Sequence, residues 1–332
     1  MDNLKKVGLT ALAGSLAAVS ANAAEMSVSG ATLLTYTTED TSEVTGNPFG
    51  MKTNLGFTAS GDVNGMTVSY MQTSVDQFAG MSSARLSVDM GDMGVIAFDQ
   101  GSGSGLKTID DKTPTAAEEI WDGLDGTTVG GLVGAAGSTG VFNYIKSFSG
   151  VTLNAAARRG SGAANSDGSS SGAGQNAYDF ALTGSGDTFG VDGLAWGVGY
   201  GEAENGGTMT GITDKGDDEH YTVFANYSFG MVTAGYQISS IAKGASGATS
   251  EEVDQWGIAV NINDDLSVSY GEREVEYAKA SSAHVTEDGE GIAVAYTMGS
   301  MKIAGNRNEV THNNGTLNSN DEVTEIALSF AF

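Results

Sequence analysis

The chain has 332 residues and a formal net charge of −26, with 49 glycines, 2 prolines and no cysteine. The absence of cysteine excludes a disulfide framework, thiol redox chemistry and cysteine-ligated metal sites. The acidic excess argues against a nucleic-acid partner, because binding to phosphates requires clustered Lys and Arg side chains.

The N-terminus begins like a secretory signal peptide. Lys5 and Lys6 precede an apolar run over residues 7–19. This run is shorter than the ~20 residues that a membrane-spanning helix needs. It therefore indicates a cleaved signal rather than a retained helical anchor.

The expected cleavage site follows the apolar run. Ala21 and Ala23 match the A-x-A pattern that precedes signal cleavage. We therefore predict that residues 1–23 are removed, with cleavage after Ala24 as the second choice. Residues 24–332 would then form a single mature domain.

The mature chain repeats one pattern along its whole length. Apolar residues alternate with polar or small ones, and each alternating segment ends at a turn. Period two is typical of a strand with one apolar and one polar face. In chain order the segments are 26–36, 49–60, 66–70, 84–90, 95–99, 141–146, 151–158, 178–182, 194–200, 221–229, 232–238, 256–262, 266–270, 292–298, 301–303 and 325–332.

The last of these segments, "EIALSFAF", keeps its apolar face to the final residue. Ile326, Leu328, Phe330 and Phe332 alternate with polar or small residues. A strand that ends at a lipid–water interface tolerates a terminal aromatic ring, whereas a soluble protein seldom exposes one. The pattern favours the closing strand of an outer-membrane barrel.

The segments together predict an all-β fold, a transmembrane antiparallel β-barrel of about sixteen strands. Short turns such as "GDVNG" alternate with long acidic loops, and proline is almost absent, as a ladder without free edges requires. A barrel of this size would enclose an aqueous lumen. A soluble β-sandwich is the alternative, but its turns would not sort into two length classes.

The predicted loops contain most of the acidic residues of the chain. They can be interpreted as a solvated rim that resists aggregation or as sites bridged by Ca²⁺ or Mg²⁺, which prefer carboxylate oxygens. No EF-hand spacing supports the second interpretation, so we expect no cofactor. Among these residues are Glu39, Asp40, Glu43, Asp214, Asp217, Asp218, Glu219, Glu251, Glu252, Asp254, Glu287, Asp288, Glu290, Asp321 and Glu322.

The longest gap between segments lies between Asp99 and Gly140 and corresponds to the third long loop. Residues 115–124 follow Pro114 and are predicted to form about two helical turns. A loop folded into the lumen of a wide barrel would narrow the channel and set its field. The predicted acidic side of this constriction consists of Asp110, Asp111, Glu118, Glu119, Asp122 and Asp125.

Strand parity supplies candidates for the opposing wall. Lys52, Arg85, Arg158 and Arg273 fall on polar strand faces and are therefore expected to point into the lumen. Facing an anionic loop, they would create a transverse field across the constriction. The alternative is that they are scattered lumen charges with local partners.

Little in the sequence indicates catalysis or a metal centre. Carboxylate pairs in the long loop could in principle act as general acid and base, but no nucleophile is placed with them. The histidines His220, His284 and His312 are expected in loops, unpaired with one another or with a serine. We expect neither enzymatic activity nor a resident metal.

Three stretches of the chain resemble a known family. The mature start "AAEMSVSGATLLTY", the strand "GDMGVIAFDQ" before the long acidic loop, and the terminal "FAF" are similar to alphaproteobacterial general porins of the Rhodobacter type. The resemblance implies a sixteen-stranded trimeric barrel whose third loop folds inward and carries acids opposite a basic wall. The chain departs from this pattern in its few wall cations and its strong acidic excess.

The expected function is that of a general diffusion porin in a Gram-negative outer membrane. It would allow passive passage of small hydrophilic solutes and ions, with a cation preference. We expect a homotrimer surrounded by outer-membrane lipids, with subunit contacts near the terminal strands, where Gly30 and Ala31 allow close approach. The alternatives are a solute-specific channel and a structural or adhesive surface barrel with a blocked lumen.

Overall fold

A computed structural model describes most of residues 25–332. The described residues are 25–39, 47–75, 81–125, 135–137, 139–160, 176–204, 216–244, 248–279 and 285–332. The predicted signal peptide, residues 1–23, lies outside them. No helix among the described residues has the length and apolar character needed to cross a membrane.

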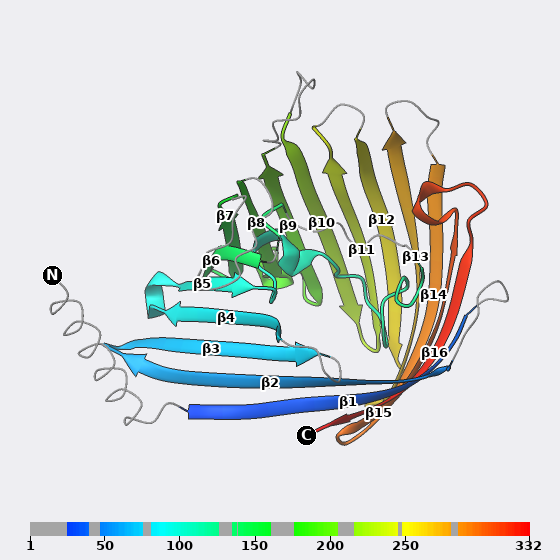
Figure 1. Cartoon of the computed structure of the whole chain (residues 1–332), viewed down its shortest axis with the longest axis horizontal. Helices are drawn as coiled ribbons and strands as arrows, with labels where there is room; N and C mark the ends of the chain where they lie inside the picture. The colour runs from blue at the N-terminus through cyan, green and yellow to red at the C-terminus, as the bar shows by residue number, and fades with distance from the viewer. Residues whose placement is uncertain are drawn as a thin grey trace, which may run out of the picture.

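The strands form one closed antiparallel barrel (Figure 1), in which β1 pairs with β16 and every other strand pairs with its neighbours in sequence. The sixteen-strand prediction is confirmed. The strands are β1 (Glu25–Glu39), β2 (Phe49–Val63), β3 (Met66–Val75), β4 (Met81–Asp89), β5 (Val95–Gln100), β6 (Thr139–Phe148), β7 (Val151–Arg158), β8 (Ala177–Ser185), β9 (Leu194–Ala203), β10 (Asp218–Phe229), β11 (Val232–Ala242), β12 (Thr249–Asn261), β13 (Leu266–Lys279), β14 (Val285–Met298), β15 (Met301–Thr311) and β16 (Asp321–Ala331).

The alternation in the sequence separates the two faces of the barrel wall. Large apolar side chains lie exposed on the outer face, among them Leu34, Ile292 and Ile326 at 48, 57 and 55 % exposure. Polar and small residues line the inner face. An apolar outer face with a polar interior is what a strand needs to cross a bilayer around an aqueous lumen.

Short turns connect neighbouring strands at one end of the barrel. Between β2 and β3, Asn64 and Gly65 both have positive φ, at 54° and 79°. Two such residues make the primed turn whose twist matches that of paired strands. The predicted "GDVNG" reversal is therefore confirmed.

Many of the acids expected in loops lie instead on strands, so that part of the prediction is wrong. Strand β1 ends late enough, and β10, β12, β14 and β16 begin early enough, to include them. Backbone pairing can continue where the apolar band ends, because outward-facing carboxylates there contact water. The described acids that lie on strands are Glu39, Asp218, Glu219, Glu251, Glu252, Asp254, Glu287, Asp288, Glu290, Asp321 and Glu322, while Asp40, Glu43 and Asp214 lie outside the described residues.

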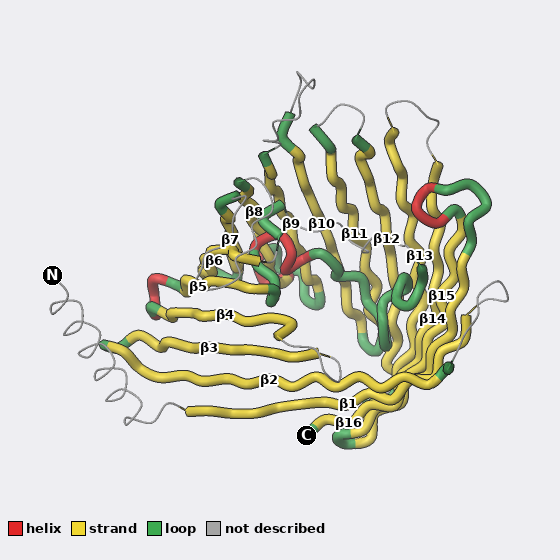
Figure 2. Tube along the Cα trace, viewed as in Figure 1, coloured by secondary structure: helices red, strands yellow, loops and turns green. Residues whose placement is uncertain are grey.

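The segment between β5 and β6, residues 101–138, is here called loop L3; its described residues 101–125 and 135–137 lie inside the barrel (Figure 2). It begins with the 3₁₀ helix η2 (Gly105–Ile109), which contacts β7, β8, β9 and β10. Leu106 and Ile109, at 1 and 0 % exposure, pack with Ala181 and Phe224 on the inner wall. This apolar contact fixes L3 to one side of the lumen.

We predict that replacing both Leu106 and Ile109 by alanine detaches η2 from the wall. Each truncation should cost about 2–5 kcal/mol of packing, and the loss falls on the loop rather than on the strand ladder. In the folded variant trypsin should cleave after Lys107 and Lys112, while the wild-type loop resists. Leu317→Ala is the matched control, because Leu317 is 67 % exposed. Equal resistance of the double variant and the wild type would show that this packing does not hold the loop.

Candidate functional site

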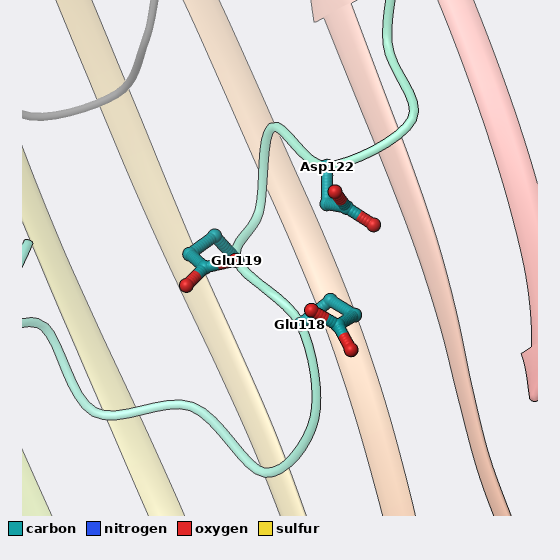
Figure 3. A group of neighbouring side chains, drawn as sticks. All are labelled: Glu118, Glu119 and Asp122. Atoms are coloured by element: carbon teal, nitrogen blue, oxygen red, sulfur yellow. The ribbon is translucent and has the colours of Figure 1, made fainter. Parts of the chain in front are cut away.

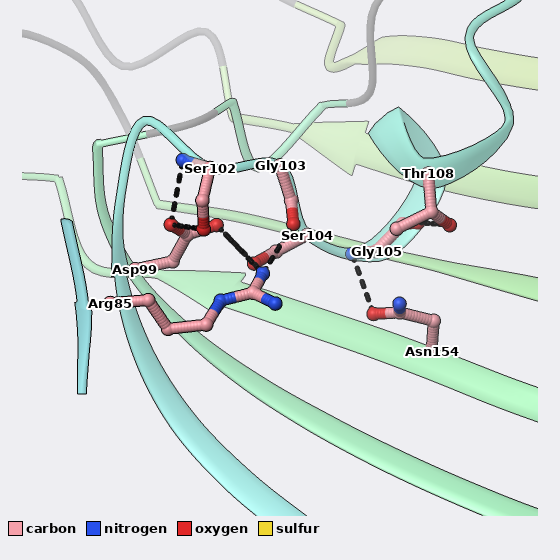
Figure 4. Close-up of polar contacts among 8 residues, drawn as sticks. All are labelled: Arg85, Asp99, Ser102, Gly103, Ser104, Gly105, Thr108 and Asn154. Carbon is pink, nitrogen blue, oxygen red and sulfur yellow. Dashed lines mark hydrogen bonds and ion pairs between the residues drawn. The ribbon is translucent and has the colours of Figure 1, made fainter. Parts of the chain in front are cut away.

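Loop L3 starts in a polar network against β4 and β5 (Figure 4). The Asp99 carboxylate accepts hydrogen bonds from the Ser102 N–H at 2.8 Å and the Ser104 Oγ at 2.5 Å. Arg85 pairs with Asp99 at 3.2 Å and also donates to the Gly103 carbonyl. Arg85 and Asp99 pair with each other and form hydrogen bonds with the loop backbone. These bonds fix the direction in which the chain leaves β5 toward the lumen.

The next stretch of L3 is held by one buried amide. The Gln237 Nε2 of β11 donates to the carbonyls of Ile109 and Asp110 at 3.1 and 2.9 Å. Its Oε1 accepts the Lys112 N–H at 2.8 Å. A single side chain thus satisfies three backbone groups of the loop and aligns it along the wall.

Inward-facing glycines allow L3 to lie close to the wall. Gly235 and Gly257 leave space for Pro114, and a Cβ at Gly291 would come within 2.9 Å of Ile120. A glycine has no Cβ, so the loop can approach the strand backbone at these positions. The loop therefore follows an arc from β7 toward β15.

The tip of L3 is bound to β15. The Asn308 Nδ2 donates to the carbonyls of Glu119 and Asp122 at 3.0 and 2.9 Å. Residues 115–124 form turns rather than the predicted helical turns. The Asn308 amide holds these turns against the wall by binding two of their carbonyls.

The end of the described tip contacts β15 and β16. The Asp125 N–H donates to the Asp321 carboxylate at 2.5 Å, and Asn313 donates to the Asp125 carbonyl. Leu124 packs with the buried Val310 and Val323. L3 is thus attached to the barrel wall at both ends of its arc and at several strands between those ends.

Three loop carboxylates converge at the tip, those of Glu118, Glu119 and Asp122 (Figure 3). One oxygen from each lies within 4.8 Å of the others. Glu118 and Asp122 border a cavity of about 380 Å³ that Lys52 of β2 also lines. Lys52 is the predicted wall cation that the structure brings to these acids.

Burial and mutual repulsion raise the pKa values of the loop acids. Burial, followed by the charge of Glu119, raises the pKa of Asp111 to about 6. Burial also raises the pKa of Glu118 and Asp122, and neighbouring carboxylates add to both shifts. Burial raises the pKa of Asp110, partly offset by nearby lysines. The proton affinity of the loop therefore exceeds that of free carboxylates.

The predicted arginines occupy different positions from Lys52. Arg158 approaches Gly137 at the end of L3, where a Cβ on the glycine would lie 2.9 Å from its Nη1. Arg273 is buried, pairs with Glu287 at 3.1 Å and lies 5.5 Å from the centre of the Trp121 ring. Together with Arg85, these side chains contact L3 or its attachment points. Their placement corresponds to the alternative of lumen charges with local partners.

The acid cluster at the tip of L3 offers oxygen ligands for a cation. A cation could contact Glu118, Glu119 and Asp122 together, since hard oxygen donors suit Ca²⁺ and Mg²⁺. The absence of a resident metal stays a prediction.

The histidines were expected in loops. His220 is buried on β10 rather than in a loop, and His312 lies between β15 and η4 (Asn313–Gly315). His284 lies outside the described residues.

The binding of L3 by five residues of the wall was not predicted from the sequence. Asn154, Asp179, Gln237, Asn308 and Asp321 all lie on inner strand faces. Their polar type and strand parity place them in the lumen, but only the path of L3 distinguishes them from other lumen residues. The inward glycines of β9, in the stretch "WGVGYG", are a sequence signal for close approach of another segment.

Comparison with solved structures finds the same architecture. OmpT, an outer-membrane protein of Vibrio cholerae, has a TM-score of 0.65 at 12 % identity, with 92 % of this chain and 97 % of that one covered. An anion-selective porin from Comamonas acidovorans has a TM-score of 0.64 at 12 % identity, covering 93 and 100 %. A mutant of the Rhodobacter-type Rh. blastica porin has a TM-score of 0.60 at 13 % identity, also covering 93 and 100 %. At these identities the likeness shows the fold.

The sequence comparison places the chain more specifically. No curated protein matches it. The sequence model of the Gram-negative porin family matches residues 8–332, which is nearly the whole chain. Members of this family are non-enzymatic channels that cross the outer membrane many times, in agreement with the expected class and location. The chain therefore belongs to the Gram-negative porin family.

Proposed function

We propose that this porin is a general diffusion channel, which allows passive passage of small hydrophilic solutes and ions and prefers cations. The observation that carries the proposal is the carboxylate cluster at the tip of L3, beside a cavity lined by Lys52. An anionic constriction concentrates cations and repels anions. No step of bond chemistry is involved, because pore width and field determine passage.

The distribution of the arginines supports the cation preference. Arg85 and Arg273 are paired with carboxylates at 3.2 and 3.1 Å. A paired cation contributes little net field at a distance. The acids of the loop tip are therefore offset chiefly by Lys52, with Lys302 acting on Glu118. The anion selectivity named for the Comamonas porin belongs to that protein, since charged side chains and not the shared fold set the preference.

Two alternatives to a general diffusion channel differ from it in measurable properties. A solute-specific channel would need a binding track in the lumen, and many of the exposed aromatic residues in the described part of the chain, such as Tyr227 and Phe229, lie on the outer face. A blocked structural or adhesive barrel would not conduct. Single-channel conductance in a planar bilayer separates these alternatives.

Neutralising the loop tip should reduce the cation preference. We predict that Glu118→Gln, Glu119→Gln, Asp122→Asn and Asp125→Asn together shift the reversal potential in a salt gradient toward anions. The wild-type preference should fade as salt rises, because the screening length falls from ~10 Å at 0.1 M to ~3 Å at 1 M.

The matched control neutralises four exposed acids on the outer face, Glu272, Glu274, Glu276 and Glu290. It removes the same charge outside the lumen and should leave the reversal potential nearly unchanged. A wild-type reversal potential on the anion side would refute the cation preference. An unchanged potential in the loop variant would show that the tip is not the selective constriction.

The cation preference should also depend on pH. Raised pKa values favour the protonated form, so the loop loses negative charge as pH falls, beginning with Asp111, whose pKa is about 6. We predict that the reversal potential moves toward zero between about pH 7.5 and about pH 5. Asp111→Asn should remove much of the change near pH 6, measured by titrating both proteins in one bilayer series. A flat profile for the wild type would contradict the proposed role of these acids.

We further propose that the chain forms a homotrimer, as the OmpT of Vibrio cholerae does in its trimer form. The terminal strands β1 and β16 pair, and β1 exposes Met26 and Val28 at 78 and 66 %. The expected role of Gly30 and Ala31 changes, because Phe332 of the same chain lies over Gly30 and Ala31 has inward parity.

Val28→Arg should therefore convert trimer into monomer in mild detergent. Val223→Arg is the control, since Val223 lies on the outer face of β10 at 48 % exposure. Both place a charge on a lipid-facing strand, at a cost of up to about 2–4 kcal/mol, but only the first lies on the proposed contact. Light scattering that gives the same mass for both variants would place the contact elsewhere.

A further inference from the structure

One buried carboxylate on the inner wall binds both ends of loop L3. Asp179 of β8 is 2 % exposed. Its Oδ1 accepts the Leu106 N–H at 3.0 Å, near the start of the loop. Its Oδ2 accepts the Ala136 N–H at 2.7 Å, near the end. Two segments far apart in the sequence are therefore joined through a single side chain.

The surroundings of Asp179 are shaped around this contact. The neighbouring Asn154 of β7 accepts the Gly105 N–H at 2.9 Å, so consecutive loop amides bind adjacent strands (Figure 4). Gly105 has a φ of 58°, and a Cβ there would collide with the carboxylate. The backbone at Gly105 thus needs glycine for its conformation and for space.

The charge of Asp179 has a nearby counterpart. The guanidinium of Arg158 acts on the carboxylate electrostatically and also lies against Gly137, next to Ala136. The two backbone N–H donors and the neighbouring cation offset part of the cost of burying this carboxylate, and hydrogen bonds to a charged acceptor are stronger than neutral ones. This arrangement makes the joint between the two loop ends rigid.

We propose that Asp179 is a positioning residue for the pore: it closes the base of L3 and thereby limits the motion of the loop segments that line the lumen near η2. The proposal rests on the pore function proposed above. The contacts of Gln237 and Asn308 hold the arc and the tip, whereas Asp179 alone joins the start and the end among the described residues. Loss of this joint frees the base without touching the acids that carry the field.

The test uses the whole porin with Asp179→Asn. Asparagine has nearly the same shape but presents one NH₂ group, which cannot accept a hydrogen bond from a backbone N–H. We expect a barrel with unchanged strand content and trimer mass. The open-channel current noise should rise several-fold, and hydrogen exchange should accelerate selectively at the Leu106 and Ala136 amides.

Asn143→Ala is the matched control. Asn143 lies on the inner face of β6, is also 2 % exposed, and has no hydrogen-bond partner for its side chain. A role in barrel stability alone would speed exchange across the strands in either variant, whereas the proposed role affects two loop amides and the current noise. Normal noise and normal exchange at both amides in Asp179→Asn would overturn the proposal.

Exchange in the wild-type protein provides a second measurement that does not depend on folding of the variant. Both amides should be strongly protected and should open together, because one carboxylate holds them. Rapid exchange of either amide in the native porin would overturn the proposal. If the wild type failed to conduct, the pore function would fail, while the exchange data would still test the joint at Asp179.

Discussion

The structure depends on one constraint: a strand in hydrocarbon has no water to satisfy its backbone N–H and C=O groups. An open sheet would leave two edges unpaired, and each unpaired group would cost several kcal/mol. Pairing between β1 and β16 removes both edges. Closure joins the first strand to the last, so the terminal "FAF" takes part in the pairing: Ala331 and Phe332 form hydrogen bonds with backbone groups of a neighbouring turn and of β1.

A barrel of sixteen strands encloses a lumen that the side chains of the wall alone cannot fill. Loop L3 narrows this lumen by lying against one part of the inner face. Its attachment uses apolar packing at Leu106 and Ile109, a buried amide at Gln237, and glycines that admit Pro114 and Ile120. The wall strands therefore have two functions on opposite faces. Their outward residues meet lipid, and their inward residues bind a loop.

The charged residues near L3 have two different roles. Arginines near L3 are paired with carboxylates or lie against the loop, so they contribute to its placement. The acids at the loop tip remain close together and partly buried, which raises their pKa values. Repulsion among them is tolerated because the loop backbone is held independently, by groups such as Asn308 and Asp321. Placement of the loop and creation of its field are thus carried by different residues.

The sequence by itself determined the strands, the orientation of their faces, and the position of the long acidic loop. Alternation with period two is a local property, and the paired positive-φ residues at Asn64 and Gly65 specify a turn without reference to distant contacts. Some acids predicted in loops lie on strands instead, because the local pattern of residues does not indicate where strand pairing stops beyond the apolar band.

Only the tertiary structure decided what the lumen residues do. Parity placed Lys52, Arg85, Arg158 and Arg273 in the lumen alike, yet the path of L3 separates Lys52 from the others. Residues 115–124 form turns that Asn308 binds to the wall, instead of the expected helical turns. Asp179 of β8 joins Leu106 to Ala136, which lie at the two ends of L3. These outcomes depend on contacts between residues far apart in the chain, which the pattern of neighbouring residues does not encode.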